Sequence, residues 1–265
     1  MVSKLPPAPN IYNLTSVKNY YEKINPNNKV FSFNKIKKEE VFKILSNTNI
    51  DKAAGIDCLT GRFLKDGALI LSEPITQICN LSVKISVVPD KFKIAKLKPL
   101  FKKGSSTDPK NYRPISLLPL ISKVLEKIIH DQTQSFLREN ELLYKFQSGF
   151  RSHHSTDFCL SYLTNKIMTG FDSGLLTGMI LIDLQTAFDT IDHDILLNKL
   201  KYIGLSSETI KWFKSYLTDR TFIVSIDNCY SNPGNLTCGV PQGSILGPLL
   251  FLLYINDMQH ASDSM

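Results

Sequence analysis

The stretch Gly178-Met-Ile-Leu-Ile-Asp183-Leu-Gln-Thr-Ala-Phe188-Asp189 decides the fold of this chain. A short, fully apolar run follows a glycine and ends abruptly at Asp183, a pattern typical of a buried strand that begins after a turn. Such a strand would carry the Asp183 carboxylate to the edge of a sheet, where burying a charge is costly unless a cation pairs with it. From this stretch alone two interpretations stay open. Asp183 caps the next turn, or it binds a metal ion in a polymerase.

A second informative stretch, GVPQGSILGPLLFLLYIND, runs from Gly239 to Asp257. Glycines and prolines punctuate its front, and Pro248 follows a glycine at a position favoured for the first residue of a helix. Gly243 allows the backbone to approach a ligand closely, and Gln242 offers an amide that both donates and accepts hydrogen bonds. Alone, this stretch is equally compatible with an ordinary junction between a loop and a buried helix.

The positive charge of the chain is concentrated in one block. The 265 residues are 43% hydrophobic and 21% charged, which is ordinary for a globular protein, and their net charge is +7. Between Lys91 and Arg113 there are eight basic residues and one acidic residue, so this block equals the whole net charge. A local basic block is the expected footprint of contact with a phosphate backbone. The alternative is a solvated, lysine-rich loop.

Other features of composition bear on the compartment. The five cysteines form no CxxC pair, and their odd number argues against a complete disulfide framework. The N-terminus lacks the apolar run of a secretory signal. The apolar run from Leu249 to Ile255 is too short to span a bilayer. We therefore expect an intracellular protein, nuclear or cytoplasmic, without a membrane segment.

Several blocks, taken in order, resemble the reverse transcriptase of non-LTR (LINE-type, jockey-like) retrotransposons. Any one block is weak evidence, whereas their collinear order from about residue 50 onward makes coincidence very improbable. Besides the two stretches quoted above, the matching blocks are Lys52-Ala-Ala-Gly-Ile-Asp57, Phe63-Leu-Lys-Asp-Gly67, Pro99-Leu-Phe-Lys-Lys-Gly104, Asn111-Tyr-Arg-Pro-Ile-Ser-Leu-Leu118, Gln147-Ser-Gly-Phe-Arg151 and Trp212-Phe-Lys-Ser-Tyr-Leu217.

The resemblance implies the α+β fold of a right-hand polymerase. Mostly helical fingers would precede an incomplete palm, whose antiparallel sheet would carry Asp183. The implied division is an N-terminal extension (1–48), fingers (49–172) and a palm (173–265), with the thumb absent.

Periodicity and capping residues predict the individual elements. The first 35 residues, rich in Pro, Asn and Lys, are expected to be irregular. A helix capped by Asp192 or Asp194 is expected to stop at Gly204, and a further helix to start at Ser206 or Ser207. The other predicted elements are helices over 35–45, 67–88 (broken at Pro74), 122–143 and 156–168, and strands over 93–101 and 221–226.

The implied activity is RNA-templated DNA synthesis by two-metal nucleotidyl transfer with Mg2+ or Mn2+. By resemblance, the Asp183 carboxylate binds both ions and the backbone carbonyl of Leu184 adds a ligand. The nearby acids Asp189, Asp192 and Asp194 are interpreted as turn and helix-cap residues.

The resemblance also implies residues that bind the nucleotide. Phe188 would lie beneath the incoming sugar and exclude a 2′-hydroxyl, although a core position is the alternative. Arg151 would clamp the triphosphate, a role that suits a guanidinium group. Gln242 and Gly243 would line the template and the nascent base pair.

The expected partners are an RNA template, a DNA primer and deoxynucleoside triphosphates. His153 and His154 have no partner at helical spacing and are interpreted as loop residues rather than zinc ligands. The residues expected to bind nucleic acid are Lys96, Lys98, Lys102, Lys103, Arg113 and Lys123.

One departure from the family pattern affects the expected activity. The resemblance implies a second block with two adjacent aspartates, and the 265 residues contain no Asp-Asp pair. We therefore expect this polypeptide by itself to be inactive or nearly so. The alternative functions are a nucleic-acid-binding remnant without catalysis, decayed or domesticated, and a maturase-like RNA-binding role.

Overall fold

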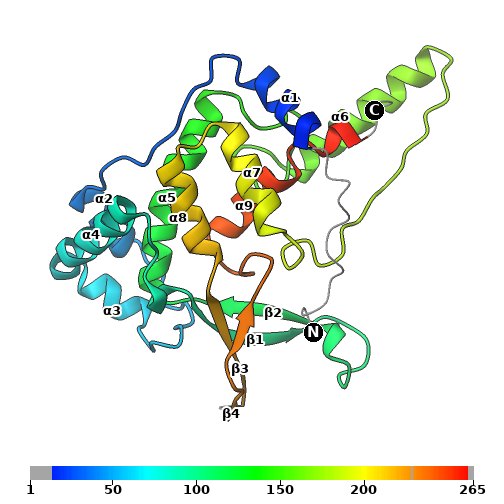
Figure 1. The fold of residues 1–265 in the computed structure, drawn as a ribbon. Coiled ribbons are helices and arrows are strands. Elements are labelled where there is room, and N and C mark those ends of the chain that lie inside the picture. The colour runs from blue at the N-terminus through cyan, green and yellow to red at the C-terminus, as the bar shows by residue number, and fades with distance from the viewer. Residues whose placement is uncertain (1–13, 228, 262–265) are drawn as a thin grey trace.

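The computed structural model describes residues 14–227 and 229–261 as a group of helices packed above one small sheet (Figure 1). This arrangement confirms the predicted α+β class. The helices are α1 (Leu14–Ile24), α2 (Lys38–Ser46), α3 (Gly61–Asp66), α4 (Ala68–Ile85), α5 (Leu120–Glu139), α6 (Thr156–Asp172), α7 (His193–Ile203), α8 (Ser207–Leu217) and α9 (Leu246–Ile255). Three short 3-10 turns accompany them at Asp90–Phe92, Pro109–Asn111 and Met258–Ala261.

The sheet is mixed rather than purely antiparallel. Its middle strand β1 (Ile94–Phe101) pairs antiparallel with β2 (Tyr112–Leu117) and parallel with β3 (Arg220–Ile226). The strands β4 (Cys229–Tyr230) and β5 (Gly234–Leu236) both pair antiparallel with β3. A parallel neighbour requires a long crossover, and α5 to α8 provide it between β2 and β3. Within 173–265, where an antiparallel sheet was expected, β4 and β5 pair antiparallel with β3, whereas the parallel β1–β3 pair was not anticipated.

The core is centred on α8. Trp212 is fully buried, its ring stacks on Tyr216 with 5.7 Å between centroids, and its Nε1 donates to Ser82 Oγ of α4 at 3.0 Å. An indole buried with its N–H satisfied contributes apolar area without the cost of an unpaired donor. The same core cluster contains residues from 1–48, 49–172 and 173–265, so the three ranges predicted as separate regions share one core.

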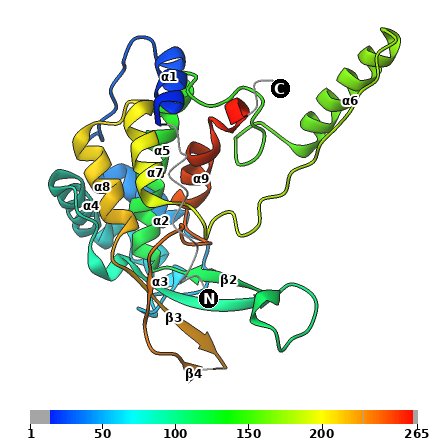
Figure 2. The ribbon, with the colours of Figure 1, turned by 45° about the vertical axis from the view of Figure 1, so that its right-hand side comes forward.

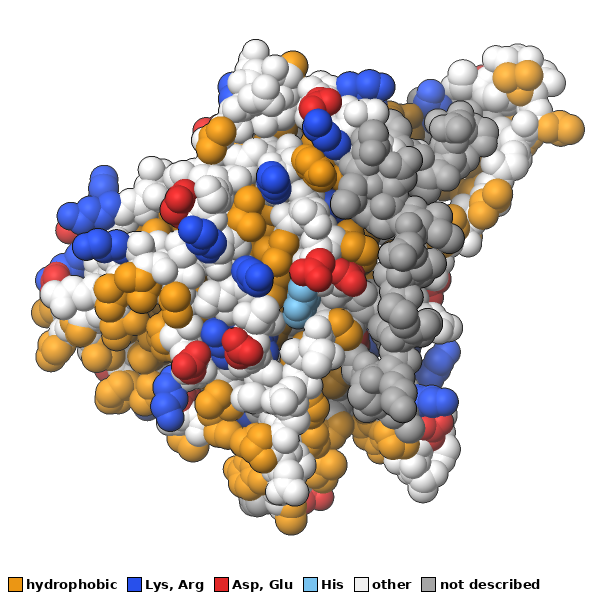
Figure 3. Space-filling view, viewed as in Figure 1, with side chains coloured by type: hydrophobic (Ala, Val, Ile, Leu, Met, Phe, Trp, Pro, Cys, Tyr) orange, Lys and Arg blue, Asp and Glu red, His pale blue; other side chains and the backbone are white. Residues whose placement is uncertain are grey.

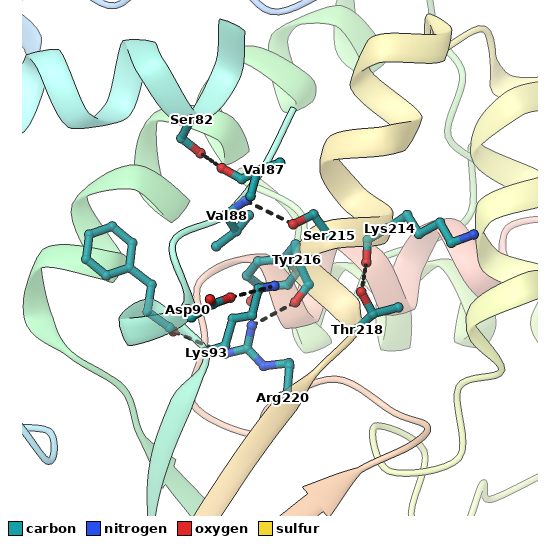
Figure 4. A network of polar contacts seen from close by, with 11 residues as sticks. Ser82, Val87, Val88, Asp90, Lys93, Lys214, Ser215, Tyr216, Thr218 and Arg220 are labelled. Atoms are coloured by element: carbon teal, nitrogen blue, oxygen red, sulfur yellow. Dashed lines mark hydrogen bonds and ion pairs between the residues drawn. The ribbon is translucent and has the colours of Figure 1, made fainter. Parts of the chain in front are cut away.

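Polar contacts attach the start of the sheet to α8 (Figure 4). The Val88 N–H donates to Ser215 Oγ at 3.0 Å, and Arg220 Nη1 donates to the Tyr216 carbonyl at 2.8 Å. Lys93, which is buried, pairs with Asp90 at 3.4 Å. Because α8 holds both the segment leading into β1 and the first residue of β3, the sheet has a fixed position under the helices.

Helix α1 corrects the expectation of an irregular N-terminal segment. Val17, Tyr20 and Tyr21 recur at helical spacing and are buried against the rest of the core. The pattern was present in the sequence, but the Pro- and Asn-rich surroundings masked it. Residues 1–13 of the predicted N-terminal extension lie outside the described residues.

Helix α4 corrects the predicted break at Pro74. The helix runs without interruption from Ala68 to Ile85, with Pro74 inside it. An interior proline costs about 3 kcal/mol. Burial of Ile75, at roughly 1.5–3 kcal/mol for a large apolar side chain, together with burial of Cys79, is of a size to offset that cost.

The helix starts and stops after residue 190 are confirmed. Asp192 accepts a hydrogen bond from Ile195 N at 2.9 Å as the N-cap of α7, and Gly204 ends α7 at φ +110. Ser206 caps α8. The helix expected to begin at Pro248 begins two positions earlier, at Leu246.

The predicted strand over 178–183 is absent, and this is the largest correction. Residues 175–184 form an exposed, extended segment without strand pairing. Together with α6, which buries none of its residues, the segment forms an arm that projects from the body in Figures 1 and 2. Ile180 is 88% exposed and Leu181 84%, and hydrophobic side chains lie along the arm's surface in Figure 3. A strand needs a partner for its backbone groups, and none of the described strands pairs with this segment.

Candidate active site

The loop Gly239–Ser244 precedes α9 in the sequence, and hydrogen bonds attach it to the turn that follows Phe188. The Val240 N–H donates to the Phe188 carbonyl at 2.8 Å, and the Gly239 N–H donates to the Ile191 carbonyl at 2.8 Å. Gly239 has φ +79, and a Cβ added there would lie 2.7 Å from the Phe188 carbonyl oxygen. The close approach of two backbones therefore requires glycine at this position.

Gln242 and Asp189 form the main polar contact of the site. Gln242 Nε2 donates to both carboxylate oxygens of Asp189, at 2.9 Å and 2.8 Å. Burial raises the pKa of Asp189 above its usual value, and the hydrogen bond from Gln242 opposes this shift. Asp189 is thus more than the turn residue that the sequence predicted, because it fixes the amide of Gln242.

The other side of the loop contacts the sheet. The Ser116 N–H of β2 donates to the Gln242 carbonyl at 2.7 Å. Gly243 has φ +114, and an added Cβ would lie 2.7 Å from the Ser116 carbonyl oxygen. The loop is therefore held between β2 and the Phe188–Ile191 turn, which joins segments that are far apart in the sequence.

Phe188 lies beside this loop in an aromatic group. It is half-buried, with its ring centroid 5.2 Å from that of Phe251 in α9 and 5.9 Å from that of Phe150. Phe188 thus lies next to the loop that carries Gln242 and Gly243.

Asp183, which was expected at the end of a strand, is not on a strand beside this group. Asp183 and Leu184 are exposed and belong to the extended segment described above. Within residues 14–227 and 229–261, no three His, Cys, Asp or Glu side chains gather so that they could hold a metal ion. The described residues therefore do not form a two-metal centre by themselves.

Arg151 binds its own loop. Its Nη1 donates to the carbonyls of Tyr144 at 2.9 Å and Gln147 at 3.2 Å. His153 and His154 lie in the turn after it, as predicted for loop residues.

The basic block is carried mainly by β1, β2 and the loop between them. Lys93 is the exception, because it is buried and paired with Asp90. Lys96 is half-exposed and lies 5.5 Å from the centre of the Tyr230 ring. The exposed members are Lys91, Lys98, Lys102, Lys103, Lys110 and Arg113.

Glu126 was not identified from the sequence, and it holds the segment between the Gln242 loop and α9 by a hydrogen bond. Glu126 is 2% exposed, and its carboxylate accepts hydrogen bonds from the Ile245 N–H at 2.6 Å and from the Tyr216 hydroxyl at 3.1 Å. Ile245 precedes α9 and follows the Gln242 loop, so Glu126 fixes the end of that loop. An acid between apolar neighbours on the inward face of a predicted helix was the signal that could have found it.

Comparison with known proteins gives consistent matches. A family model described as reverse transcriptase (RNA-dependent DNA polymerase) matches residues 100–264. The chain is 34% identical over 230 residues to the probable RNA-directed DNA polymerase from transposon BS of Drosophila melanogaster, covering 84% of this chain and 25% of that protein. It is 34% identical over 226 residues to the corresponding X-element protein of the same species (83% and 24%). It is also 34% identical over 224 residues to the RNA-directed DNA polymerase from mobile element jockey of Drosophila funebris (83% and 24%).

The chain therefore spans about a quarter of the length of the curated relatives it matches. No described helix is both long and apolar enough to cross a membrane, and the five cysteines are free thiols.

Proposed function

The chain belongs to the reverse transcriptase family, in the group found in non-LTR retrotransposons, and we propose that it supplies part of the nucleic-acid and nucleotide site of an RNA-directed DNA polymerase. Its partners in this role are an RNA template, a DNA primer and deoxynucleoside triphosphates. The alternatives without catalysis are not favoured, because the relatives named above are polymerases.

The observation that carries this proposal is the position of the Gln242–Gly243 loop. The loop is bonded on one side to Asp189 and on the other to Ser116 of β2. The strand β2 also carries Arg113, three positions before Ser116, so the loop is attached to one of the basic strands. Rigid placement of polar groups beside positive charge suits a site that must hold a base pair and its phosphates.

The roles of the individual residues follow from this arrangement. Phe188 would lie beneath the incoming sugar, beside Gln242 and Gly243 at the nascent base pair. Arg151 would bind the triphosphate through N–H groups other than the Nη1 that holds its own loop. Asp183, with the carbonyl of Leu184, would supply ligands for Mg2+ or Mn2+, whose chemistry is to activate the primer hydroxyl and stabilise the leaving pyrophosphate.

The division into fingers (49–172) and palm (173–265) belongs to the same proposal. Under it, the basic strands lie in the fingers and the Gln242 loop in the palm.

The register of β1 and β2 supports a nucleic-acid surface. Lys98 pairs with Ile115, and Leu100 pairs with Arg113. Since side chains alternate along a strand and paired residues share a face, Lys96, Lys98 and Arg113 lie on one face of the ladder. Such a row of cations matches the repeating charge of a phosphate backbone.

Replacing Lys98, Lys102, Lys103 and Lys110 by alanine should weaken binding to RNA and to DNA alike. With each phosphate contact that is lost, fewer counterions are released on binding. The slope of the logarithm of the binding constant against the logarithm of the salt concentration should therefore become less steep by roughly 0.7–0.9 for each contact. Fluorescence anisotropy with the 265-residue chain, at several salt concentrations, measures both quantities.

The matched control replaces four exposed lysines on α3, α4 and α8, outside the β1–β2 block: Lys65, Lys84, Lys211 and Lys214. Both variants lose the same charge, so a general effect of net charge would weaken them equally. An unchanged affinity and salt slope in the β1–β2 variant would mean that the block is a solvated loop.

A further inference from the structure

A cavity of about 560 Å³ lies between α2 and α5, away from the Gln242–Asp189 contact. Its volume is within the range of roughly 300–1,000 Å³ that is usual for ligand sites. Its apolar lining comes from both helices and from the residue before α9: Ile44, Leu120, Val124, Ile128 and Ile245. Its charged lining comprises Lys43, Lys52, Lys123 and Lys127 together with Glu40 and Asp131.

The acids of this lining are already engaged. Glu40 accepts the Lys37 N–H at 3.1 Å in the capping box of α2. Asp131 pairs with Lys127 at 2.7 Å and with His130 Nδ1 at 3.0 Å.

Three lysines remain at the cavity without an ion pair to any described residue: Lys43, Lys52 and Lys123. The lining as a whole carries four lysines and two carboxylates, so its side chains leave a net positive charge.

Lys123 is the most enclosed of these three cations. Burial lowers its pKa, the Glu126 carboxylate opposes this shift, and the like charge of Lys52 lowers the pKa further. Both oxygens of Glu126 are occupied by the Ile245 N–H and the Tyr216 hydroxyl. A bound anion would therefore relieve the repulsion between Lys52 and Lys123.

The fold places Lys52 here through a close backbone contact. A Cβ added at Gly55 would lie 2.8 Å from Pro119 N, so the loop that carries Lys52 is pressed against the residues that begin α5. Lys123 lies one turn into α5. Two lysines from separate segments are thus held at one opening by the backbone rather than by a charged partner.

We infer that this cavity binds an unpaired nucleotide, with the base against the apolar lining and a phosphate at Lys52 and Lys123. An apolar floor with a basic opening matches a nucleotide, which combines a flat base with a charged phosphate. The nucleotide is either a unit of a single-stranded nucleic acid or a free nucleoside phosphate. The inference rests on the proposed function, because it adds a second nucleic-acid contact to the β1–β2 surface.

The test uses the 265-residue chain and a short labelled single-stranded RNA. Replacing Lys52 and Lys123 by alanine should weaken RNA binding about tenfold at moderate salt. Replacing Lys18 and Lys23 of α1, with the same loss of charge, should change it little. An abasic strand of equal length should bind the wild-type chain more weakly than the RNA does. Thermal melting checks that each variant folds.

A second measurement needs no variant. Saturating RNA should protect Lys52 and Lys123 from acetylation, as measured by mass spectrometry. The same measurement with metal-free ATP in place of RNA identifies the source. Protection of Lys52 and Lys123 by ATP indicates a free nucleoside phosphate, and protection by RNA but not by ATP indicates a unit of a strand.

Two results would overturn the inference. The first is that the variant without Lys52 and Lys123 binds RNA as tightly as the wild-type chain and that RNA does not protect either amine of the wild-type chain from acetylation. The second is that an abasic strand binds as tightly as RNA, which would mean that the cavity binds the phosphate but not the base. If the β1–β2 variant loses RNA affinity while the Lys52 and Lys123 variant keeps it, only this inference fails. If the wild-type chain binds no RNA, the proposed function fails with it.

Discussion

Replacing Asp183 by alanine is expected to abolish primer extension in a polymerase that joins this chain to the region following the matched segment of a jockey-element enzyme. Under the proposal, the Asp183 carboxylate would hold metal ions that contribute several kcal/mol of transition-state stabilisation, and their loss corresponds to a decrease in rate of roughly a thousandfold or more. Primer extension on an RNA template with Mg2+, under single-turnover conditions, measures the loss.

Asp194 provides the matched control. It is an exposed aspartate in the first turn of α7, so Asp194→Ala removes the same charge from the same region of the chain. Its rate should stay within about twofold of the parent, because a surface charge at a helix start contributes little. Comparable activity in the Asp183→Ala and parent enzymes would remove Asp183 from the metal site.

Replacing Glu126 by alanine is expected to give a large loss of stability. Glu126 is 2% exposed and Arg220 1% exposed. Truncation would leave the Tyr216 hydroxyl and the Ile245 N–H without this acceptor, and the buried guanidinium of Arg220 would lose its favourable interaction with the Glu126 charge. Removing one member of such a network costs about 3–5 kcal/mol, or roughly 10 °C in melting temperature for a chain of this size.

The control for this change is Glu139→Ala at the exposed end of the same helix, which should alter the free energy of unfolding by no more than about 0.5 kcal/mol. Chemical denaturation of the 265-residue chain measures both variants. A Glu126→Ala chain as stable as the Glu139→Ala chain would contradict the buried network.

Glu126→Gln separates the charge of Glu126 from its hydrogen bonds. Burial raises the pKa of Glu126 above its usual value of 4.5. A raised pKa stabilises the fold fully below the unfolded value, and this stabilisation is lost as pH rises toward the folded value. The wild-type chain should therefore lose stability relative to Glu126→Gln as pH increases above about 4.5. Parallel pH profiles for the two chains would mean that the pKa of Glu126 is not raised.

Much of the fold was predictable because its signals are local. Asp192, Ser206 and Gly204 act within one turn of their helices, and the structure confirms all three. The alternation around Ile94–Phe101 predicted β1 correctly. The collinear blocks identified the family, because the order of motifs along a sequence can be read without knowing which residues are in contact.

Two predictions were wrong because burial in the core outweighed the local preference of the sequence. Pro74 remains inside α4 because one face of that helix, including Ile75 and Cys79, is buried against the core. The first helix forms because Tyr20 and Tyr21 find the core, although the surrounding composition predicted irregular structure. In both cases the free energy comes from distant residues that the local sequence does not contain.

The sequence by itself determined the family, the helix starts and stops after residue 190 and the candidate residues. Only the tertiary structure decided which of them meet. The apolar run before Asp183 had the pattern of a strand, yet it stays extended and exposed since a strand needs a neighbour for its backbone groups. The Gln242–Asp189 and Glu126–Ile245 contacts each join residues more than fifty positions apart. Such pairs depend on the packing of whole helices and strands, so no periodicity or spacing within a short stretch could have placed them.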